Sequence, residues 1–283
     1  MSKSIGILGC GWLGLPLGEH LLSLGFRVKG STTSEERLNT LHSKSIEPYI
    51  LQVTEEGIVG EMSFFSSVDK LIIAMPPGLR SNPKRRFDVM INHVKKACIE
   101  QGIKEVIFIS STSVYGNLHG IITEKSNTEP ETNSGKQLLQ CEKLLSDSIH
   151  FNTTILRMGG LIGADRHPVF QLSKKEFVTN PKGSINLIHL TDCINIIGIL
   201  INQIIVKNLN NYSCLAAKLW GASFGCRSSC VSCRCSVGGL SLNLVTRMVI
   251  VSSTVILNSI ALSRFLVDKF VLISESISII FKF

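Results

Sequence analysis

The sequence predicts an α/β fold, a doubly wound parallel sheet with helices on both faces. Short apolar runs alternate with segments of helical periodicity over the first two hundred residues. Strand–helix–strand alternation is typical of parallel sheets whose crossovers are helices. The first apolar run breaks into a cluster of glycines, as at a ligand-binding turn. A length of 283 residues suits either one large α/β domain or a domain of this type with a smaller partner.

The glycine cluster follows a predicted strand that begins at Ile5 and precedes a predicted helix over 15–24. In a dinucleotide-binding turn, Gly9 allows the tight turn and Gly11 lets the backbone approach a pyrophosphate. Gly14 lets the helix pack close to the strand. The alternative is an ordinary glycine-rich turn. The predicted cofactor contacts are Gly9, Cys10, Gly11, Trp12, Leu13 and Gly14.

The second predicted strand, over 26–33, ends in hydroxyl side chains: Ser31, Thr32 and Thr33. NAD-binding folds usually place a carboxylate there to hold the ribose 2′-OH. With hydroxyls instead, and Arg37 a turn further on, the sequence favours NADP while leaving NAD open. Ser34 is also expected to cap a helix over 35–41, and both interpretations can hold.

Further strands are predicted over 49–53, 69–75 and 105–110, with a helix over 87–101. The 69–75 run is apolar throughout, as a strand covered on both faces should be. Its end lies at the carboxyl edge of the sheet, where doubly wound folds bind ligands. Four more residues are predicted to contact the cofactor: Ala74, Met75, Pro76 and Ser110.

A run of hydroxyl residues, Ser-Ser-Thr-Ser-Val-Tyr-Gly over 110–116, follows the strand over 105–110. At the carboxyl end of a central strand these side chains face the cofactor crevice. A Ser or Tyr hydroxyl there can hydrogen-bond a substrate carbonyl during hydride transfer.

Four segments together resemble the extended short-chain dehydrogenase/reductase superfamily, of the NAD-dependent epimerase/dehydratase type. They are the glycine motif, the 110–116 run, Leu-Arg-Met-Gly-Gly-Leu-Ile-Gly over 156–163 and Asn-Leu-Ile-His-Leu-Thr-Asp over 186–192. Their order and spacing match over about residues 1–212. The resemblance implies a Rossmann-like domain, and Ser111 then takes the place of the active-site Ser or Thr.

The chain departs from that family on the next helix, where a Tyr-x-x-x-Lys pair is expected. Ser134 stands at the Tyr position and Leu138 at the Lys position. A Ser hydroxyl is far too weakly acidic without a base, and Leu carries no charge. Lys136 lies about 200° around the helix from the expected place. The chain therefore resembles an atypical member without the catalytic pair.

Other polar residues each have a functional and a structural interpretation. Tyr115 is a substitute acid or a packed ring, and Arg157 meets a substrate anion or forms an ion pair. Arg166 and His167 resemble the loop that begins the substrate lobe, where His167 is a general base or an exposed loop residue. His189 is expected to be structural.

Charge and cysteine usage favour a cytoplasmic protein with a small-molecule substrate and no nucleic-acid or membrane partner. The net charge is +8, but residues 212–283 carry seven Lys and Arg residues against two acidic ones. This reflects missing acids rather than a basic cluster, a poor nucleic-acid footprint. Four scattered cysteines are expected to be reduced: Cys10, Cys98, Cys141 and Cys193. The oligomeric state stays open.

The resemblance divides the chain into a cofactor domain over 1–160, the start of a substrate lobe over 161–212 and an aberrant tail over 213–283. Thr191 and Asp192 are expected to cap an apolar helix over 194–206, too short to span a membrane.

The tail changes composition abruptly, which favours translation of a shifted reading frame. A zinc site at Cys230, Cys233 and Cys235 lacks a second pair at zinc-ribbon spacing, so no metal is expected. The stretch over 248–263 is uncharged but is interrupted by Ser, Thr and Asn, which argues against a membrane helix.

The sequence thus predicts an NADP-preferring oxidoreductase or epimerase-like protein acting on a nucleotide sugar or a similar carbonyl or alcohol. The candidate catalytic residues are Ser111, Tyr115 and Ser134, and the candidate substrate contacts are Arg157, Arg166 and His167. The second interpretation is a non-catalytic NADP(H)-binding sensor, which the missing Tyr and Lys favour.

Overall fold

The computed structural model describes residues 3–118, 122–173, 186–207, 213–215, 248–251 and 254–257. The chain divides into two compact units. The first comprises Met1–His119, Glu124–Met158 and Leu190–Leu215, and the second comprises Gly120–Thr123, Gly159–His189 and Ala216–Phe283. Each unit is described by itself.

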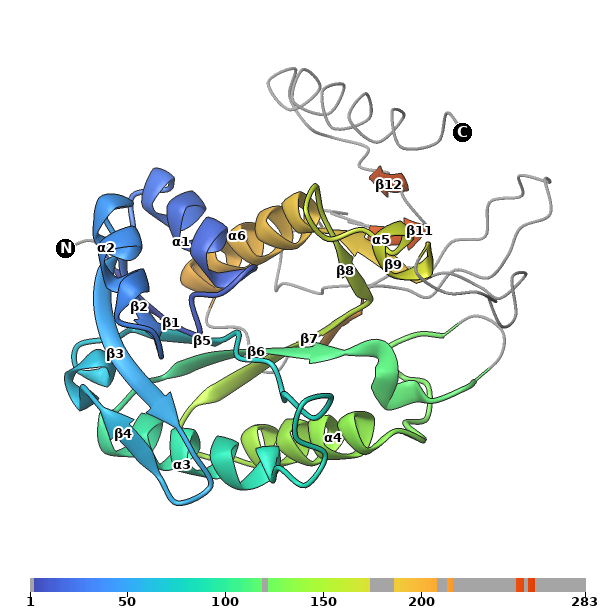
Figure 1. The fold of residues 1–283 in the computed structure, drawn as a ribbon, viewed down its shortest axis with the longest axis horizontal. Coiled ribbons are helices and arrows are strands. Elements are labelled where there is room, and N and C mark those ends of the chain that lie inside the picture. Colours follow the sequence, from blue (N-terminus) through green and yellow to red (C-terminus); the bar gives the residue numbers. More distant parts are fainter. Residues whose placement is uncertain are drawn as a thin grey trace, which may run out of the picture. The chain divides into compact units, whose positions relative to one another are not determined.

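The first unit contains an eight-stranded sheet in the order β10-β7-β6-β5-β1-β2-β3-β4 (Figure 1). All neighbours are parallel except β4, which is antiparallel to β3. Both β1 and β5 are buried along their whole length, because helices cover both faces of the sheet. The strands are β1 Ser4–Leu8, β2 Arg27–Thr32, β3 Glu47–Val53, β4 Ile58–Gly60, β5 Lys70–Ile73, β6 Glu105–Ser111, β7 Asn152–Met158 and β10 Ser213–Leu215.

The direction of strand addition reverses beside β1. The chain adds β2 and β3 on one side of β1, then crosses to add β5, β6 and β7 on the other. In doubly wound sheets the crevice for a ligand lies at such a reversal, outside the carboxyl ends of the strands. The fold therefore places the ends of β1 and β5 at the candidate site.

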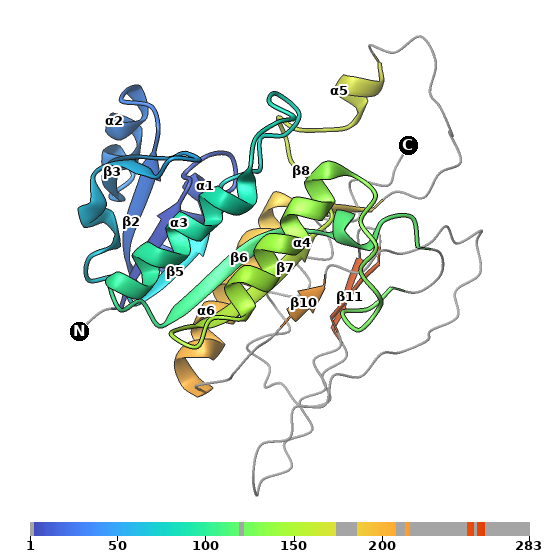
Figure 2. The ribbon, with the colours of Figure 1, turned by 90° about the horizontal axis from the view of Figure 1, so that it is seen from below.

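Helices cover both faces of the sheet (Figures 1 and 2). One face carries α1 Gly14–Ser23, α2 Glu36–Ser43 and α6 Leu190–Lys207, and the other carries α3 Phe87–Glu100 and α4 Asn133–Ser146. Two short 3₁₀ helices, η1 Met62–Phe65 and η2 Thr112–Tyr115, complete the first unit. The buried stripe of α3 matches the predicted helical period: Phe87, Met90, Ile91, Val94, Ala97 and Cys98.

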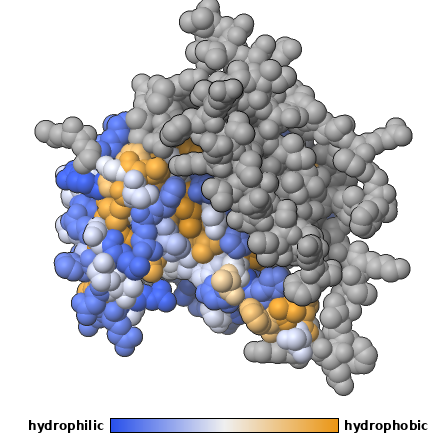
Figure 3. Space-filling model, turned by 90° about the horizontal axis from the view of Figure 1, so that it is seen from above, coloured by the Kyte–Doolittle hydropathy of each residue, from blue (hydrophilic) through white to orange (hydrophobic). Residues whose placement is uncertain are grey.

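On the α1 face, α6 packs closely against α1. A methyl group on Gly198 would stand 2.7 Å from Nε2 of His20, so the imidazole would have to shift to admit a side chain there. Hydrophilic and hydrophobic side chains lie interspersed on the visible described part of the molecule seen from above (Figure 3). Exposed apolar residues of this helix pair include Leu24 and Ile199. None of the helices among the described residues has the length and apolarity needed to cross a membrane.

In the second unit, β8 Gly160–Ile162 pairs in parallel with β9 Leu187–His189, and α5 spans Val169–Leu172. The strands β11 Met248–Val251 and β12 Thr254–Leu257 form an antiparallel pair. The cysteine cluster over 230–235 lies outside the described residues. So does most of the 213–283 tail, apart from β10, β11 and β12.

The predicted parallel sheet with helices on both faces is confirmed, and two predicted helix caps are wrong. α2 begins at Glu36 without a side-chain cap, because the Ser34 N–H bonds Oγ1 of Thr32 and Ser34 sits in the turn before the helix. α6 begins at Leu190, so Thr191 and Asp192 lie within its first turn.

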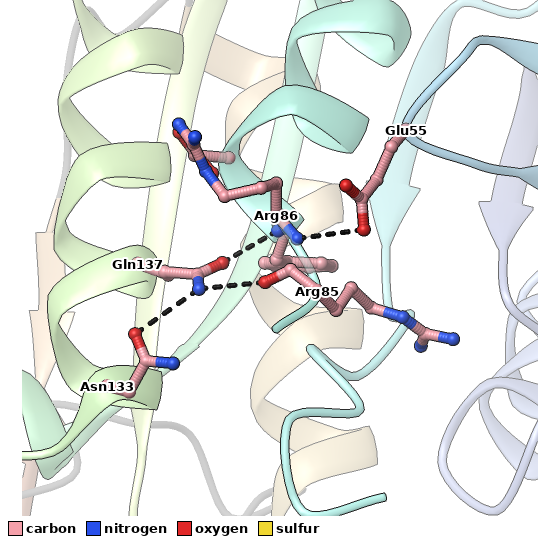
Figure 4. A network of polar contacts seen from close by, with 7 residues as sticks. Glu55, Arg85, Arg86, Asn133 and Gln137 are labelled. Carbon is pink, nitrogen blue, oxygen red and sulfur yellow. Dashed lines mark hydrogen bonds and ion pairs between the residues drawn. The ribbon is translucent and has the colours of Figure 1, made fainter. Parts of the chain in front are cut away.

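A buried amide joins α4 to the start of α3 (Figure 4). Oε1 of Gln137 accepts the Phe87 N–H at 2.7 Å, and its Nε2 donates to the carbonyl oxygen of Arg85 at 2.9 Å. Asn133 adds a contact from the same helix. Because Gln137 is only 7% exposed, these bonds fix where the loop from β5 enters α3.

Candidate functional site

The loop between β1 and α1 is shaped by its three glycines. Gly9 has a φ of +100°, and a Cβ on it would stand 3.0 Å from the backbone nitrogen of Met75. A Cβ on Gly14 would collide with the carbonyl oxygen of Gly9. A Cβ on Gly11 would have no atom within 4 Å. The first and third glycines are therefore required by packing, whereas Gly11 faces open space.

β2 holds this loop from the side. The Ser31 hydroxyl accepts the Gly9 N–H at 2.9 Å, and its carbonyl accepts the Cys10 N–H at 2.8 Å. Ser31 is buried, so its side chain shapes the glycine loop rather than facing a ligand at the surface. The Cys10 side chain is also buried, and burial raises the pKa of its thiol to about 12.

Beyond Ser31, the strand end offers few free hydroxyls. The Thr32 hydroxyl is buried and bonds the Ser34 backbone. Thr33 and Arg37 are exposed, and Arg37 lies in the first turn of α2. Of the three predicted hydroxyl contacts, Thr33 alone presents an exposed side chain.

The carboxyl ends of β6 and β7 carry a buried polar cluster. Ser110 is in register with Arg157, so both side chains lie on the same face of the sheet, the face that α4 covers. Glu142 of α4 accepts from Oγ of Ser110 at 2.5 Å. Its carboxylate also accepts from Arg157, from Nε at 3.0 Å and from Nη2 at 2.6 Å. The ion pair that the sequence left open for Arg157 is present.

Tyr115 joins the same cluster. Nη1 of Arg157 donates to its hydroxyl at 2.6 Å, and the guanidinium lies 4.9 Å from the ring centroid. Burial raises the pKa of Tyr115, and the bond from Arg157 opposes that shift. Burial alone would lower the pKa of Arg157, but Glu142 raises it, so the guanidinium stays charged. The ring is packed, as the structural interpretation of Tyr115 expects.

Ser111 and Ser134 lie on two segments that touch. Oγ of Ser111 accepts the Ser113 N–H at 3.2 Å and caps η2, and no described residue takes its proton. A methyl on Gly135 would stand 2.7 Å from the carbonyl oxygen of Ser113, so the first turn of α4 lies against η2. This brings half-buried Ser134 next to the 111–115 segment.

The position expected for a catalytic Lys is filled by an apolar residue. Leu138 is 4% exposed and packs into the core, whereas Lys136 is exposed to solvent. The chain therefore supplies no cation at the Lys position.

Arg166 and His167 belong to the second unit. The backbone of Arg166 forms an isolated antiparallel β-bridge with that of Gly163. Nδ1 of His167 accepts the Val169 N–H at 3.2 Å. Across the described parts of both units, no three His, Cys, Asp or Glu side chains gather where they can hold a metal ion.

Sequence reasoning missed two polar residues that organise this region. Glu142 and Gln137 are ordinary helix residues in the sequence, and nothing local marks their partners. The one available signal was burial, because both fall on the helix face that also carries Leu138 and Leu145.

Comparison with known proteins agrees with this geometry. The chain is 33% identical over 204 residues to Protein YeeZ of Escherichia coli K12, covering 70% of this chain and 73% of that protein. A Bacillus cereus UDP-glucuronic acid 4-epimerase, solved with UDP-glucuronic acid and NAD, superposes with a TM-score of 0.60. It is 19% identical over 75% of this chain and 77% of its own.

A second B. cereus enzyme, a UDP-N-acetylglucosamine 4-epimerase, superposes with a TM-score of 0.56 at 16% identity, covering 76% of this chain and 78% of its own. A scan against models of protein families found no match. This chain belongs to the family of Protein YeeZ. It shares a Rossmann-like sheet with the two epimerases, and it carries Ser134 and Leu138 where a Tyr and a Lys were expected.

Replacing Glu142 should destabilise the first unit. Glu142→Leu leaves the buried Arg157 guanidinium without its carboxylate, and we expect the free energy of unfolding to fall by about 3 kcal/mol. The double variant with Arg157→Met should recover most of that loss, because no charge is then left buried. Urea denaturation followed by circular dichroism measures both.

Lys143→Leu, an exposed change on the same helix, is the control and should shift stability by less than about 0.5 kcal/mol. Wild-type stability in the Glu142→Leu variant would contradict the structural importance of the pair.

Proposed function

We propose that the protein is an NADP(H)-preferring oxidoreductase of the epimerase/dehydratase type that acts on a nucleotide sugar or a similar carbonyl or alcohol. The observation that carries the proposal is the glycine loop, where packing requires Gly9 and Gly14 while Gly11 faces open space. A packed turn alone would explain the first and third glycines but not a second one with no neighbour.

The loop suits a pyrophosphate for two physical reasons. Gly11 has no side chain, so a phosphate can approach the backbone closely. α1 begins at Gly14, and the first N–H groups of a helix have no partner within it, so they and the helix dipole favour an anion. Leu13 and Gly14 would present N–H groups there, and Met75 lines the other side of the loop.

The NADP preference rests on the end of β2. Thr33 and Arg37 are exposed, and the strand end carries no carboxylate to repel a 2′-phosphate. The hydroxyls of Ser31 and Thr32 already form hydrogen bonds within the protein, so these residues would contact the cofactor through their backbone.

When bound, the nicotinamide supplies the hydride acceptor or donor. The Ser111 hydroxyl can donate a hydrogen bond to a substrate carbonyl oxygen, because no described residue accepts from it. Ser134, on the adjoining turn of α4, is a second hydroxyl for the same substrate. Tyr115 holds its hydroxyl against Arg157 and has a raised pKa, so it serves the site by packing and not as the acid.

A second function, an NADP(H)-binding sensor without turnover, is favoured by one observation. Buried Leu138 occupies the place of the Lys that would lower the pKa of a proton donor, and Ser134 occupies the place of that donor. Binding and chemistry rest on different residues, so this function keeps the glycine loop and dispenses with the reaction.

The first expected outcome concerns Gly11. Gly11→Ala should leave the thermal transition unchanged, because the new methyl meets no protein atom, and should weaken NADP⁺ binding at least about tenfold. Gly14→Ala is the matched variant, in which the methyl collides with the Gly9 carbonyl and should cost about 1–3 kcal/mol of stability. Calorimetric titration and thermal unfolding measure the two effects. An unchanged NADP⁺ affinity in Gly11→Ala would refute the dinucleotide site.

The second concerns cofactor choice. Arg37→Gln should lower the affinity for NADP⁺ about tenfold and leave that for NAD⁺ unchanged, because only NADP⁺ carries the 2′-phosphate. Arg27→Gln removes the same charge at the amino end of β2, at the opposite edge of the sheet, and should change neither affinity. Equal losses for both cofactors would argue against the assignment of Arg37.

The third separates enzyme from sensor. The full chain is given NADP⁺ with UDP-glucose or UDP-glucuronic acid, or NADPH with a carbonyl panel, and NADPH absorbance is followed. We expect turnover that Ser111→Ala reduces about 100-fold with an unchanged cofactor affinity. Wild-type binding without any turnover would contradict the reaction and support the sensor.

A further inference from the structure

The loop over 76–86, between β5 and α3, is basic and is held in one conformation by hydrogen bonds. Two successive turns shape it: the Asn82 N–H bonds the carbonyl oxygen of Gly78 at 3.1 Å, and the Arg85 N–H bonds that of Asn82 at 3.2 Å. Buried Leu79 fixes its middle. The loop is therefore ordered by its own backbone as well as by its ends.

Contacts from two other elements hold its far end. Nδ2 of Asn133 donates to the carbonyl oxygen of Pro83, and Gln137 bonds the carbonyl oxygen of Arg85. Oε1 of Glu55, at the β3–β4 turn, accepts the Arg86 N–H at 3.1 Å. Because these bonds already fix the loop, binding of a ligand would cost it little conformational entropy.

The loop carries four cations and no acid: Arg80, Lys84, Arg85 and Arg86. Arg86 is paired by Nε and Nη2 with both carboxylate oxygens of Asp88, at 3.0 and 2.8 Å. Within the described part of the chain, the side chains of the other three have no ion pair or hydrogen bond. Three cations on a fixed loop are left to an outside anion.

Arg85 lies against Gly78, near the start of the loop. Its Nη1 lies across Gly78, where a methyl group would collide with it, and its side chain is only half exposed. Gly78 follows Met75 by three residues, and Met75 is in contact with Gly9. Figure 4 shows the Arg85 side chain extending away from α4, whereas Arg86 points the opposite way.

We propose that Arg85, with Arg80 and Lys84, forms a second anion site that binds a phosphate group beside the glycine loop. The proposal rests on the proposed function only in that the neighbouring loop holds a dinucleotide. The phosphate is either the cofactor's own or that of a phosphorylated substrate, and a guanidinium suits both by donating two parallel hydrogen bonds.

The alternative is a solvated basic loop without a ligand. Such a loop does not explain why Arg85 lies along the backbone of Gly78 without an acidic partner while Arg86 is paired with Asp88. The two arginines carry the same charge on adjacent residues, which makes them a matched pair for a test.

The test titrates the full chain with inorganic pyrophosphate by calorimetry, alone and after saturation with NADP⁺. The variants are Arg85→Gln and Arg86→Gln, which remove the same charge from adjacent residues. We expect pyrophosphate affinity to fall about tenfold or more in Arg85→Gln and less than about twofold in Arg86→Gln. Thermal unfolding should be alike in the two variants.

The two sources of phosphate give different results. Competition between pyrophosphate and NADP⁺, with NADP⁺ binding also weakened in Arg85→Gln, assigns the site to the cofactor. Binding of pyrophosphate to the NADP⁺-saturated protein, with the same loss, assigns it to a second ligand. Equal effects of the two variants, or no pyrophosphate binding by the wild type, overturn the anion site. If the wild type binds pyrophosphate but not NADP⁺, the proposed function is contradicted and the anion site is retained.

Discussion

The candidate site depends on one close approach of backbone to backbone, where the end of β1 meets the end of β5. Gly9 touches Met75 and Gly14 touches Gly9, so strand, turn and helix meet with no side chain between them. Because strand order reverses beside β1, this contact lies at the crevice of the sheet. The loop after β5 starts from the same point, which is why the basic segment over 76–86 begins beside the glycine loop.

Sequence reasoning found most of the first unit because its signals are local. Buried strands such as β1 and β5 are short apolar runs, and α3 shows a full helical period. β4 was missed because its three residues are largely exposed and pair through a turn with positive φ at Gly57. The start of α2 was misplaced because Thr32 bonds the backbone of Ser34, a choice between neighbours that the sequence leaves open.

The candidate site was predictable only where backbone shape decides it. The spacing of the glycines indicates their roles. The partner of Arg157 is Glu142, fifteen residues earlier on a helix, and no local sequence pattern identifies it. The same holds for Gln137, whose partners lie across the sheet face on another helix. Buried polar groups find partners through tertiary packing, and their identity follows only when the helices are in place.

The polar cluster also explains how α4 is anchored without a Tyr at position 134 and a Lys at position 138. Leu138 is buried and adds apolar packing to α4. The nearby charges, Glu142 and Arg157, form an ion pair with each other. Glu142 also accepts a hydrogen bond from Ser110, and Arg157 donates one to Tyr115. Ser111 is held by its backbone and by η2, against which the first turn of α4 packs. The position of Ser111 therefore does not depend on a Tyr at position 134 or a Lys at position 138.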